Sequence, residues 1–329
     1  MRCPRRHFLR LVAGAAALSA APRLARAQAY PTRPITIIVP FAAGGGTDIV
    51  TRTLAEQMRG SLGQPVIVEN VAGAAGSIGV GRAVRAAADG YTLIVGTITT
   101  HALIGALYSL PFDLVDDFAP VAQLGSEPLL IVGKKGLPAD RLDELLTWLK
   151  SNPDKASVGI AGVGAIGHVT GISFQKITGT RFQSVPYRGN GPALQDLIAG
   201  QIDLMIEPSS NFLSYVRAGT LKAFAVAAKS RLPTASTIPT TEEAGLPGFY
   251  ASLWYGMWAP KGTPTPIVSR LNGAVVEALA PSQVRSRLAE LGLEIAPSEQ
   301  QTPQALKALQ QAEIAKWWPI IKAANIKAE

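Results

Sequence analysis

A local pattern repeats along the chain: a short β-branched apolar run, a glycine-rich turn and then a helical stretch. At its first occurrence, Ile35–Val39 is the predicted strand, residues 40–46 form a loop and residues 48–58 a helix. Short apolar runs favour buried strands, and the helical periodicity that follows favours a helix packed against the sheet. The pattern therefore predicts an α/β fold built from βαβ units.

The remaining predicted elements fall into two sets. The first set adds strands at 66–69 and 92–95 and a helix at 78–88. The second set contains strands at 129–132, 157–160, 182–186, 202–206 and 223–227, with helices at 142–150, 168–177 and 193–199. A long strand is expected at 252–259, followed only by helices at 266–279, 283–291 and 303–324.

Chain length favours two domains, because 329 residues that are 47% hydrophobic exceed what one core usually holds. We expect two doubly wound α/β lobes joined by a two-strand hinge, with crossovers near residues 127 and 251. Lobe 1 comprises residues 28–126 plus 251–329, and lobe 2 comprises residues 127–250. The helical C-terminal segment, without a strand of its own, is expected to pack on lobe 1. In such sheets, ligands bind beyond the carboxyl ends of the strands.

Residues 1–27 have the features of an export signal. Four arginines precede the apolar run 11–18, and Ala25-Arg26-Ala27 supplies a small-x-small cleavage site. The run is far shorter than the ~20 residues of a membrane span. We expect cleavage after Ala27, with Ala29 as the second choice, and a periplasmic location. Arg5-Arg6 followed by Phe8-Leu9 resembles a twin-arginine signal, and an ordinary export signal stays open.

Cleavage changes the charge and removes the cysteine. The first 27 residues hold six arginines and no acid, so the formal net charge falls from +8 to +2. This charge gives no support to nucleic-acid binding. Cys3, the single cysteine, is also removed, which excludes disulfides and thiolate metal sites in the mature chain.

The loop 41–48 lies between a predicted strand and a predicted helix and holds three consecutive glycines. Its N–H groups and the positive end of the helix dipole can converge on an anion. It matches neither the Walker motif nor G-x-G-x-x-G, and a plain tight turn capped by Asp48 is the alternative. The residues of this loop expected to contact the ligand are Phe41, Ala43, Gly44, Gly45 and Thr47.

Two further loops, 72–79 and 161–168, repeat this arrangement, one in each predicted lobe. Facing N–H groups suit a ligand with a carboxylate at each end and need no arginine. Hydroxyls that follow the strand 92–95 can donate to the same cleft. The additional expected contacts are Gly73, Ala74, Thr97, Thr99, Thr100, Ala161, Gly162, Gly164, Ala165 and His168.

Glu207 ends a predicted strand and is a further candidate for the ligand site. A carboxylate there would favour an amino or hydroxyl group of the ligand, or an ordered water. An ion pair with Arg217 is the alternative. We expect Trp254, Tyr255 and Trp258 to pack in the core rather than to stack on a ligand.

Catalysis has little support in the sequence. Residues 75–79 resemble a nucleophile elbow around Ser77, but Ala75 replaces the first glycine. After signal cleavage only His101 and His168 remain as imidazole bases, and their spacing pairs neither with Ser77. Two histidines without cysteine are also poor material for a metal site. We predict no catalytic residue, no metal, no cofactor and no enzymatic activity.

Ordered segments along the mature chain resemble the Bug family, the periplasmic receptors of tripartite tricarboxylate transporters. The resemblance rests on Tyr30-Pro31-Thr32-Arg33-Pro34-Ile35, Val39-Pro40-Phe41 through Asp48, Val68-Glu69-Asn70, residues 89–93, 117–121, 185–189, 221–226 and 245–249, and Ala259-Pro260-Lys261-Gly262-Thr263-Pro264. It implies a Venus-flytrap fold that closes on a small carboxylate, with loops 41–47 and 161–165 holding the carboxyl groups. It also implies no cofactor and two membrane subunits as partners of a monomeric receptor. A sensory receptor that presents its bound form to a membrane signalling protein is the alternative.

This chain departs from the family pattern at three places. Asn70-Val71-Ala72-Gly73 stands where Asn-Arg-Pro-Gly is common, and Ile104-Gly105 stands where Asn-Pro is common. Ile160 and Ile166 occupy positions that are often polar. We expect a more apolar cleft, which favours an aromatic or longer aliphatic acid over citrate.

Overall fold

The computed structural model describes residues 30–323 and 326. The predicted export signal and Cys3 lie outside these residues. Arg33–Glu329 form one compact unit, and the fold below is that of this unit. Among the described residues, no helix combines the length and apolar character that a membrane span requires.

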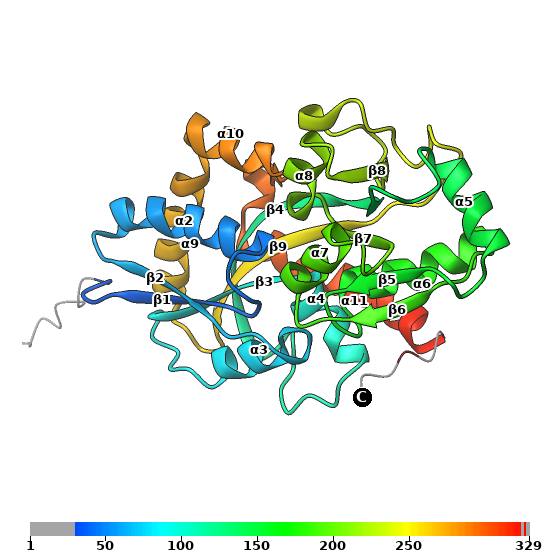
Figure 1. The fold of residues 1–329 in the computed structure, drawn as a ribbon. Coiled ribbons are helices and arrows are strands. Elements are labelled where there is room, and N and C mark those ends of the chain that lie inside the picture. The colour runs from blue at the N-terminus through cyan, green and yellow to red at the C-terminus, as the bar shows by residue number, and fades with distance from the viewer. Residues whose placement is uncertain (1–29, 324–325, 327–329) are drawn as a thin grey trace, which may run out of the picture. The chain divides into compact units, whose positions relative to one another are not determined.

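The strands of the described part form one ten-stranded sheet in the order β2-β1-β3-β9-β4-β7-β5-β6, with β8 and β10 also paired to β4. Figure 1 shows β4 and β9 running between the two parallel sets of strands. The strands are β1 (Ile35–Val39), β2 (Val66–Asn70), β3 (Thr92–Thr97), β4 (Phe118–Lys134), β5 (Ser157–Ile160), β6 (Gln183–Pro186), β7 (Leu204–Pro208), β8 (Leu221–Val226), β9 (Ser252–Pro260) and β10 (Glu294–Ile295).

Helices follow most of the strands. They are α2 (Gly46–Leu62), α3 (Ser77–Val84), α4 (Ile98–His101), α5 (Leu142–Ser151), α6 (Ile166–Thr178), α7 (Asn190–Ile198), α8 (Leu213–Arg217), α9 (Thr265–Leu279), α10 (Ser282–Glu290) and α11 (Pro303–Ala323). Short 3-10 turns include η1 (Ala74–Gly76), η2 (Leu103–Ala106) and η3 (Ser209–Asn211). The predicted α/β class is confirmed: β1 lies parallel to β2 and β3, and β5 lies parallel to β6 and β7.

β4 connects the two parallel sets. Its first part pairs with β9 as far as Pro128, opposite Ser252, and from Leu129 it pairs with β7, opposite Pro208. The partner change falls beside the crossovers expected near residues 127 and 251. Where sequence patterning predicted a strand only at 129–132, the structure has one strand of 17 residues. Its β9-paired half begins with residues that carry no simple apolar period, and pairing with β9 holds it extended.

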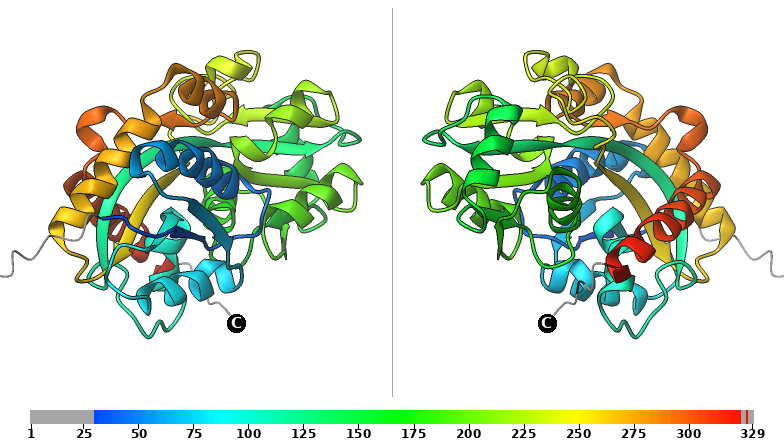
Figure 2. Two further views of the ribbon diagram at one scale, coloured as in Figure 1. Left: turned by 90° about the vertical axis from the view of Figure 1, so that its left-hand side faces the viewer. Right: turned by 90° about the vertical axis from the view of Figure 1, so that its right-hand side faces the viewer.

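The C-terminal segment packs on β4 and on the helical segment that follows β3. Figure 2 shows α9 and α11 beside the crossing strands β4 and β9, and both helices contact β4. Gln310 on α11 donates to the carbonyls of His101 and Leu114 at 2.8 and 2.7 Å. The expectation of no strand in this segment is wrong, because Glu294 and Ile295 form β10 against Ser126 and Gly125.

Several helix boundaries differ from the predicted ones. α2 begins at Gly46 rather than at residue 48, and it ends at Leu62, followed by Gly63 in a left-handed conformation (φ 65°). α3 ends at Val84, four residues early. The predicted burial of the aromatic run is observed: Trp254, Tyr255 and Trp258 are each at most 3% exposed.

Candidate functional site

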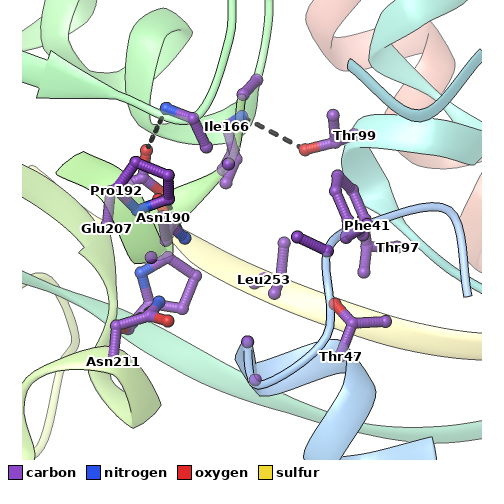
Figure 3. Close-up of a pocket in the computed structure, with 18 of the residues that line it drawn as sticks. Phe41, Thr47, Thr97, Thr99, Ile166, Asn190, Pro192, Glu207, Asn211 and Leu253 are labelled. Carbon is purple, nitrogen blue, oxygen red and sulfur yellow. Dashed lines mark hydrogen bonds between the residues drawn. The ribbon is translucent and has the colours of Figure 1, made fainter. Parts of the chain in front are cut away.

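A cavity of about 120 Å³ opens at the carboxyl ends of the parallel strands. One water needs only about 10–15 Å³ of such volume, so a small organic molecule has room. Figure 3 shows residues of the two strand sets facing each other across it. The loop after β1 contributes Phe41, Ala42, Ala43, Gly45, Gly46 and Thr47, and the segment after β3 contributes Thr97 and Thr99. The opposite wall holds Ala161, Ala165 and Ile166 after β5, Gly189 to Pro192 after β6, and Glu207, Pro208 and Asn211 at the end of β7 and beyond it.

Asp48 holds the first loop in place. Its Oδ2 accepts hydrogen bonds from Gly44 N–H and Arg52 Nε, both at 2.9 Å, and its Oδ1 accepts one from Asn70 Nδ2 at 2.9 Å. Burial alone would raise the pKa of Asp48, but these hydrogen bonds and the Arg52 charge lower it below its ordinary value. Asn70 Nδ2 also donates to Phe41 O at 3.1 Å. The ionised Asp48 is thus a fixed anchor of the loop.

In the part of the chain that the structure describes, three helices of eight or more residues begin at this cavity: α2, α6 and α7. The first intrahelical bond of α2 runs from Ile49 N–H to Gly45 O, and that of α6 runs from Val169 N–H to Ala165 O. In each of these two helices, the backbone N–H groups of the residues that precede Ile49 and Val169 have no acceptor within the helix. Helix dipoles add partial positive charge at the same ends. The cavity therefore favours an anionic ligand, although none of the described residues lining it is lysine or arginine.

Direct contacts join the two walls. Ile166 N–H donates to Thr99 Oγ1 at 3.2 Å, which Figure 3 marks as a dashed line. Tyr108 OH donates to Val163 O at 3.4 Å. A Cβ at Gly164 would lie 2.0 Å from Leu107 Cδ1, so the loop after β5 lies directly on the segment after α4.

Glu207 is buried, with 1% of its surface exposed, and it lines the cavity. Oε1 accepts a hydrogen bond from Ala161 N–H at 3.3 Å, and Oε2 accepts one from Asn190 Nδ2 at 3.4 Å. Burial raises the pKa of Glu207 to about 8. Arg217, the alternative partner, instead donates to the carbonyls of Thr234 and Glu290. Glu207 thus lines the cavity, and its carboxyl has no ion-pair partner among the described residues.

Part of the predicted ligand-binding residues line the cavity. Phe41, Ala43, Gly45, Thr47, Thr97, Thr99, Ala161, Ala165 and Glu207 line it. Gly44, Gly73, Ala74, Thr100, Gly162, Gly164 and His168 do not.

The predicted ligand residues that do not line the cavity have contacts elsewhere in the structure. Gly164 N–H donates to His168 Nδ1 at 3.0 Å, which closes the loop before α6. Thr100 is fully buried, and its Oγ1 accepts the Thr97 N–H at 2.9 Å. The loop 72–79 packs behind the first loop, since a Cβ at Gly79 would lie 2.9 Å from Pro40 Cα. This loop supports the cavity wall from outside.

Neither histidine is placed to activate Ser77. The ring of His101 is fully buried and stacks on Trp258 with 3.7 Å between centroids. Its Nδ1 lies 2.9 Å from Thr100 Oγ1, and burial lowers the pKa of His101 to about 3. His168 Nδ1 accepts the Gly164 N–H. Among the described residues, no group of three His, Cys, Asp or Glu side chains is placed to hold a metal.

Sequence patterning missed one whole wall segment. Gly189, Asn190, Gly191 and Pro192 line the cavity at the start of α7. The signal was present, because Tyr187-Arg188-Gly189-Asn190-Gly191-Pro192 is another glycine-rich link between a strand and a helix. Leu253 on β9 was also missed, and it had no local signal.

The family departures affect the cavity less than expected. Only Ile166 among them lines it. Ile104 is buried in the core, and a Cβ at Gly105 would lie 2.7 Å from the ring of Trp318. Ile160 is buried at the end of β5. The apolar part of the lining comes from Phe41, Ile166, Leu253, prolines and alanines.

Comparison with known proteins gives consistent matches over most of the chain. The family model described as tripartite tricarboxylate transporter family receptor matches residues 50–326. BugT of Bordetella pertussis is 36% identical over 303 residues, which cover 92% of this chain and 92% of BugT. MatC from Rhodopseudomonas palustris, solved with bound malate, is 41% identical with a TM-score of 0.85, over 89% of this chain and 100% of MatC. An R. palustris protein solved with adipate is 34% identical with a TM-score of 0.87, over 91% of this chain and 100% of that protein.

Proposed function

Because the chain belongs to the receptor family of tripartite tricarboxylate transporters, we propose that it captures a small carboxylate in the cavity and presents it to membrane transport subunits. Membership confirms the resemblance drawn from the sequence motifs. The family is one of receptors and not a class of enzymes. Reversible binding, rather than chemistry, is then the output of the site.

The convergence of the α2, α6 and α7 N-termini on one cavity carries this proposal. Helix N-termini bind anions through free N–H groups and the helix dipole. Two of these helices belong to the opposite wall from the third, which suits a ligand with carboxylates at both ends. The malate bound by MatC and the adipate bound by the second R. palustris protein are both dicarboxylates, which supports the same ligand class.

We also propose the division into lobes. Lobe 1 is residues 28–126 with 251–329, lobe 2 is residues 127–250, and β4 and β9 connect them. A ligand that contacts both walls stabilises the closed arrangement over an open one by its differential affinity. The Thr99–Ile166 hydrogen bond and the Tyr108–Val163 hydrogen bond would form on closure. Membrane subunits would recognise that closed form.

The ligand preference follows from the lining. Phe41, Ile166 and Leu253 offer apolar surface between the helix N-termini. A longer aliphatic or aromatic dicarboxylate buries more apolar area there than citrate, at about 25 cal/mol per Å². The third carboxylate of citrate would also face an uncharged wall. Citrate is therefore expected to bind more weakly than adipate.

A thermal-shift screen of the mature protein from Gln28 tests the proposal. A ligand at 100 times its Kd adds about 2.7 kcal/mol to the free energy of unfolding. We expect a clear rise in Tm with adipate, malate or an aromatic dicarboxylate and none with uncharged sugars. A flat response to every carboxylate would contradict the proposed ligand class. Displacement of bound adipate by equimolar citrate would contradict the apolar preference.

Export to the periplasm belongs to the same proposal. The predicted signal, residues 1–27, precedes the described residues. When the full-length chain is expressed, we expect the protein in the periplasmic fraction to begin at Gln28. Replacement of Arg5 and Arg6 by lysine is expected to block export by the twin-arginine route, whereas unchanged export would indicate the ordinary route.

A further inference from the structure

The carboxyl of Glu207 occupies a tightly built position in the cavity wall. A Cβ at Gly167, in the first turn of α6, would lie 2.1 Å from Glu207 Oε1, so only glycine leaves room for the acid. Ala161 N–H and Asn190 Nδ2 are its hydrogen-bond donors, at 3.3 and 3.4 Å. Both distances are at the long end of the hydrogen-bonding range. The carboxyl is therefore fixed in place but weakly compensated.

Among the described residues, no cation forms an ion pair with Glu207. On β4, Glu127 is also buried, and its negative charge opposes a second charge at Glu207. On α6, Lys176 lies in the last turn, far from the cavity end of that helix, and burial lowers the pKa of His168. On α7, Asp196 accepts a hydrogen bond from Tyr187 OH at 2.6 Å.

An ion pair lies at the end of β4 and the start of β7, at the opposite end of β7 from Glu207. Asp203, before the first residue of β7, pairs with Lys134 at 2.7 Å. No titratable residue lies in β5 itself. Ionisation of Glu207 would thus place an unpaired negative charge beside helix ends that are to receive a carboxylate. Burial without a cation favours the protonated form, in agreement with the raised pKa of about 8.

We propose that Glu207 binds the ligand as a neutral carboxylic acid and donates its proton in a hydrogen bond to a carboxylate oxygen of the ligand. The inference rests on the proposed function and specifies the chemistry of one end of the site. Protonated Glu207 carries one O–H donor, and an O–H···O⁻ bond is among the stronger hydrogen bonds. An ionised Glu207 would instead repel the same oxygen.

Asn190 fits this arrangement. Its Oδ1 is buried and has no partner among the described residues. Its Nδ2 donates to Glu207 Oε2, so Asn190 does not compete with the ligand for the O–H of the protonated acid. Ligands with a carboxylate at this end are selected, and ligands with an ammonium group there are not.

Binding then couples to proton uptake. Ligand carboxylates are ionised throughout the range from pH 7 to 9, so the titrating group is Glu207. When the free protein has lost the Glu207 proton, binding must recover it from solvent. With a pKa of about 8 in the free protein, the Kd for adipate should be about tenfold higher at pH 9 than at pH 7.

Calorimetric titration of the mature protein with adipate and malate tests the proposal. At pH 8, repetition in buffers of different ionisation enthalpy should show uptake of about half a proton per ligand bound. Glu207→Gln retains a donor and an acceptor of similar shape, and it should bind with no proton uptake and with a Kd that is constant from pH 7 to 9. The ligand-free Tm at pH 9 serves as the control for folding.

The outcomes separate this inference from the proposed function. A wild-type Kd that is constant from pH 7 to 9, with no proton uptake, overturns the acid role while carboxylate binding stands. A Kd that falls as pH rises overturns it too, since ionised Glu207 would then be the binding form. Absence of binding by any carboxylate at any pH overturns both proposals. The wild-type measurements decide the question even if Glu207→Gln fails to fold.

Discussion

Glu127 and Glu207 are two buried glutamates with opposite surroundings. Each is 1% exposed. Glu127 lies on β4 where its pairing changes, and its carboxylate accepts hydrogen bonds from Ser209 Oγ at 3.0 Å, Ser210 N–H at 2.7 Å and Ser210 Oγ at 3.0 Å, and a fourth from Tyr255 OH. Glu207 has two longer hydrogen bonds and faces the cavity.

The difference separates a structural acid from a ligand-facing one. Four donors match the acceptor capacity of an ionised carboxylate, so Glu127 is held by β4, β9 and η3 together. Burial raises the pKa of Glu127, and its four hydrogen bonds oppose that shift. Glu207 has unused hydrogen-bonding capacity at a cavity. Equal burial therefore carries different meanings, and the hydrogen-bond partners decide between them.

Replacement of Glu127 should have the largest effect on stability. Glu127→Ala leaves the hydroxyls of Ser209, Ser210 and Tyr255 without their buried acceptor, and the free energy of unfolding should fall by about 3–5 kcal/mol. Urea unfolding of the ligand-free protein at pH 7 measures this. Glu207→Ala is the matched control and should change the free energy of unfolding by less than about 1 kcal/mol, since water can reach that side of the cavity. Equal losses would refute the contrast.

The pH dependence of stability should differ between wild type and Glu207→Gln. The ordinary pKa of 4.5 applies to the unfolded chain and about 8 to the native one, so the native state holds the proton between these values. Stability from this group is full below pH 4.5, decreases as pH rises, and is lost above about pH 8. Wild type should lose about 3.5 kcal/mol relative to Glu207→Gln between pH 5 and 8. Parallel stability curves from urea unfolding would contradict this expectation.

Gly46 lies between the loop that follows β1 and the hydroxyl groups that donate to Glu127. A Cβ at this position would lie 2.5 Å from Ser210 Oγ and 3.3 Å from Tyr255 OH. Gly46→Ala should therefore displace the first turn of α2 and weaken adipate binding by about tenfold, or 1.4 kcal/mol. Gly60→Ala, in the same helix with no atom within 4 Å of the new Cβ, is the control and should leave the Kd unchanged. Calorimetric titration compares the two variants, and equal Kd values would show that the contact is tolerated.

The hydrogen bond across the cavity should have the smallest effect. Thr99→Val keeps the side-chain shape but removes the acceptor for Ile166 N–H, and the Kd should rise by about fivefold, or 1 kcal/mol. Thr147→Val is the control, because Thr147 Oγ1 bonds only within α5, to Asp143 O. An unchanged Kd for Thr99→Val would mean that ligand binding does not depend on this contact.

The fold was largely predictable, because strand and helix periodicity is local. The strands β1, β2, β3, β5, β6, β7 and β8 all begin within two residues of the predicted starts. The first half of β4 and the short β10 were not predictable in this way. Both are held extended by backbone pairing with strands distant in the sequence, β9 for the former and β4 for the latter.

The candidate site was predictable where glycine loops follow strands and was missed elsewhere. Phe41, Thr47, Ala161 and Ala165 were found because their loops precede helices. The loop 72–79 has the same local pattern, yet it packs behind Pro40 and does not line the cavity. Only the position of a strand within the sheet determines whether its following loop faces the ligand.

The sequence by itself determined the alternation of strands and helices, the resemblance to a receptor family and the placement of glycine-rich loops before helices, since these depend on neighbouring residues. The tertiary structure alone decided which loops converge, that Leu253 reaches the cavity, and that Glu127 is saturated while Glu207 is not. The contrast between the two glutamates depends on hydrogen bonds between residues 46 to 128 positions apart, such as Ala161 with Glu207 and Glu127 with Tyr255. Local patterns carry no record of such partners, because the sheet order that brings them together is fixed only when the whole chain packs.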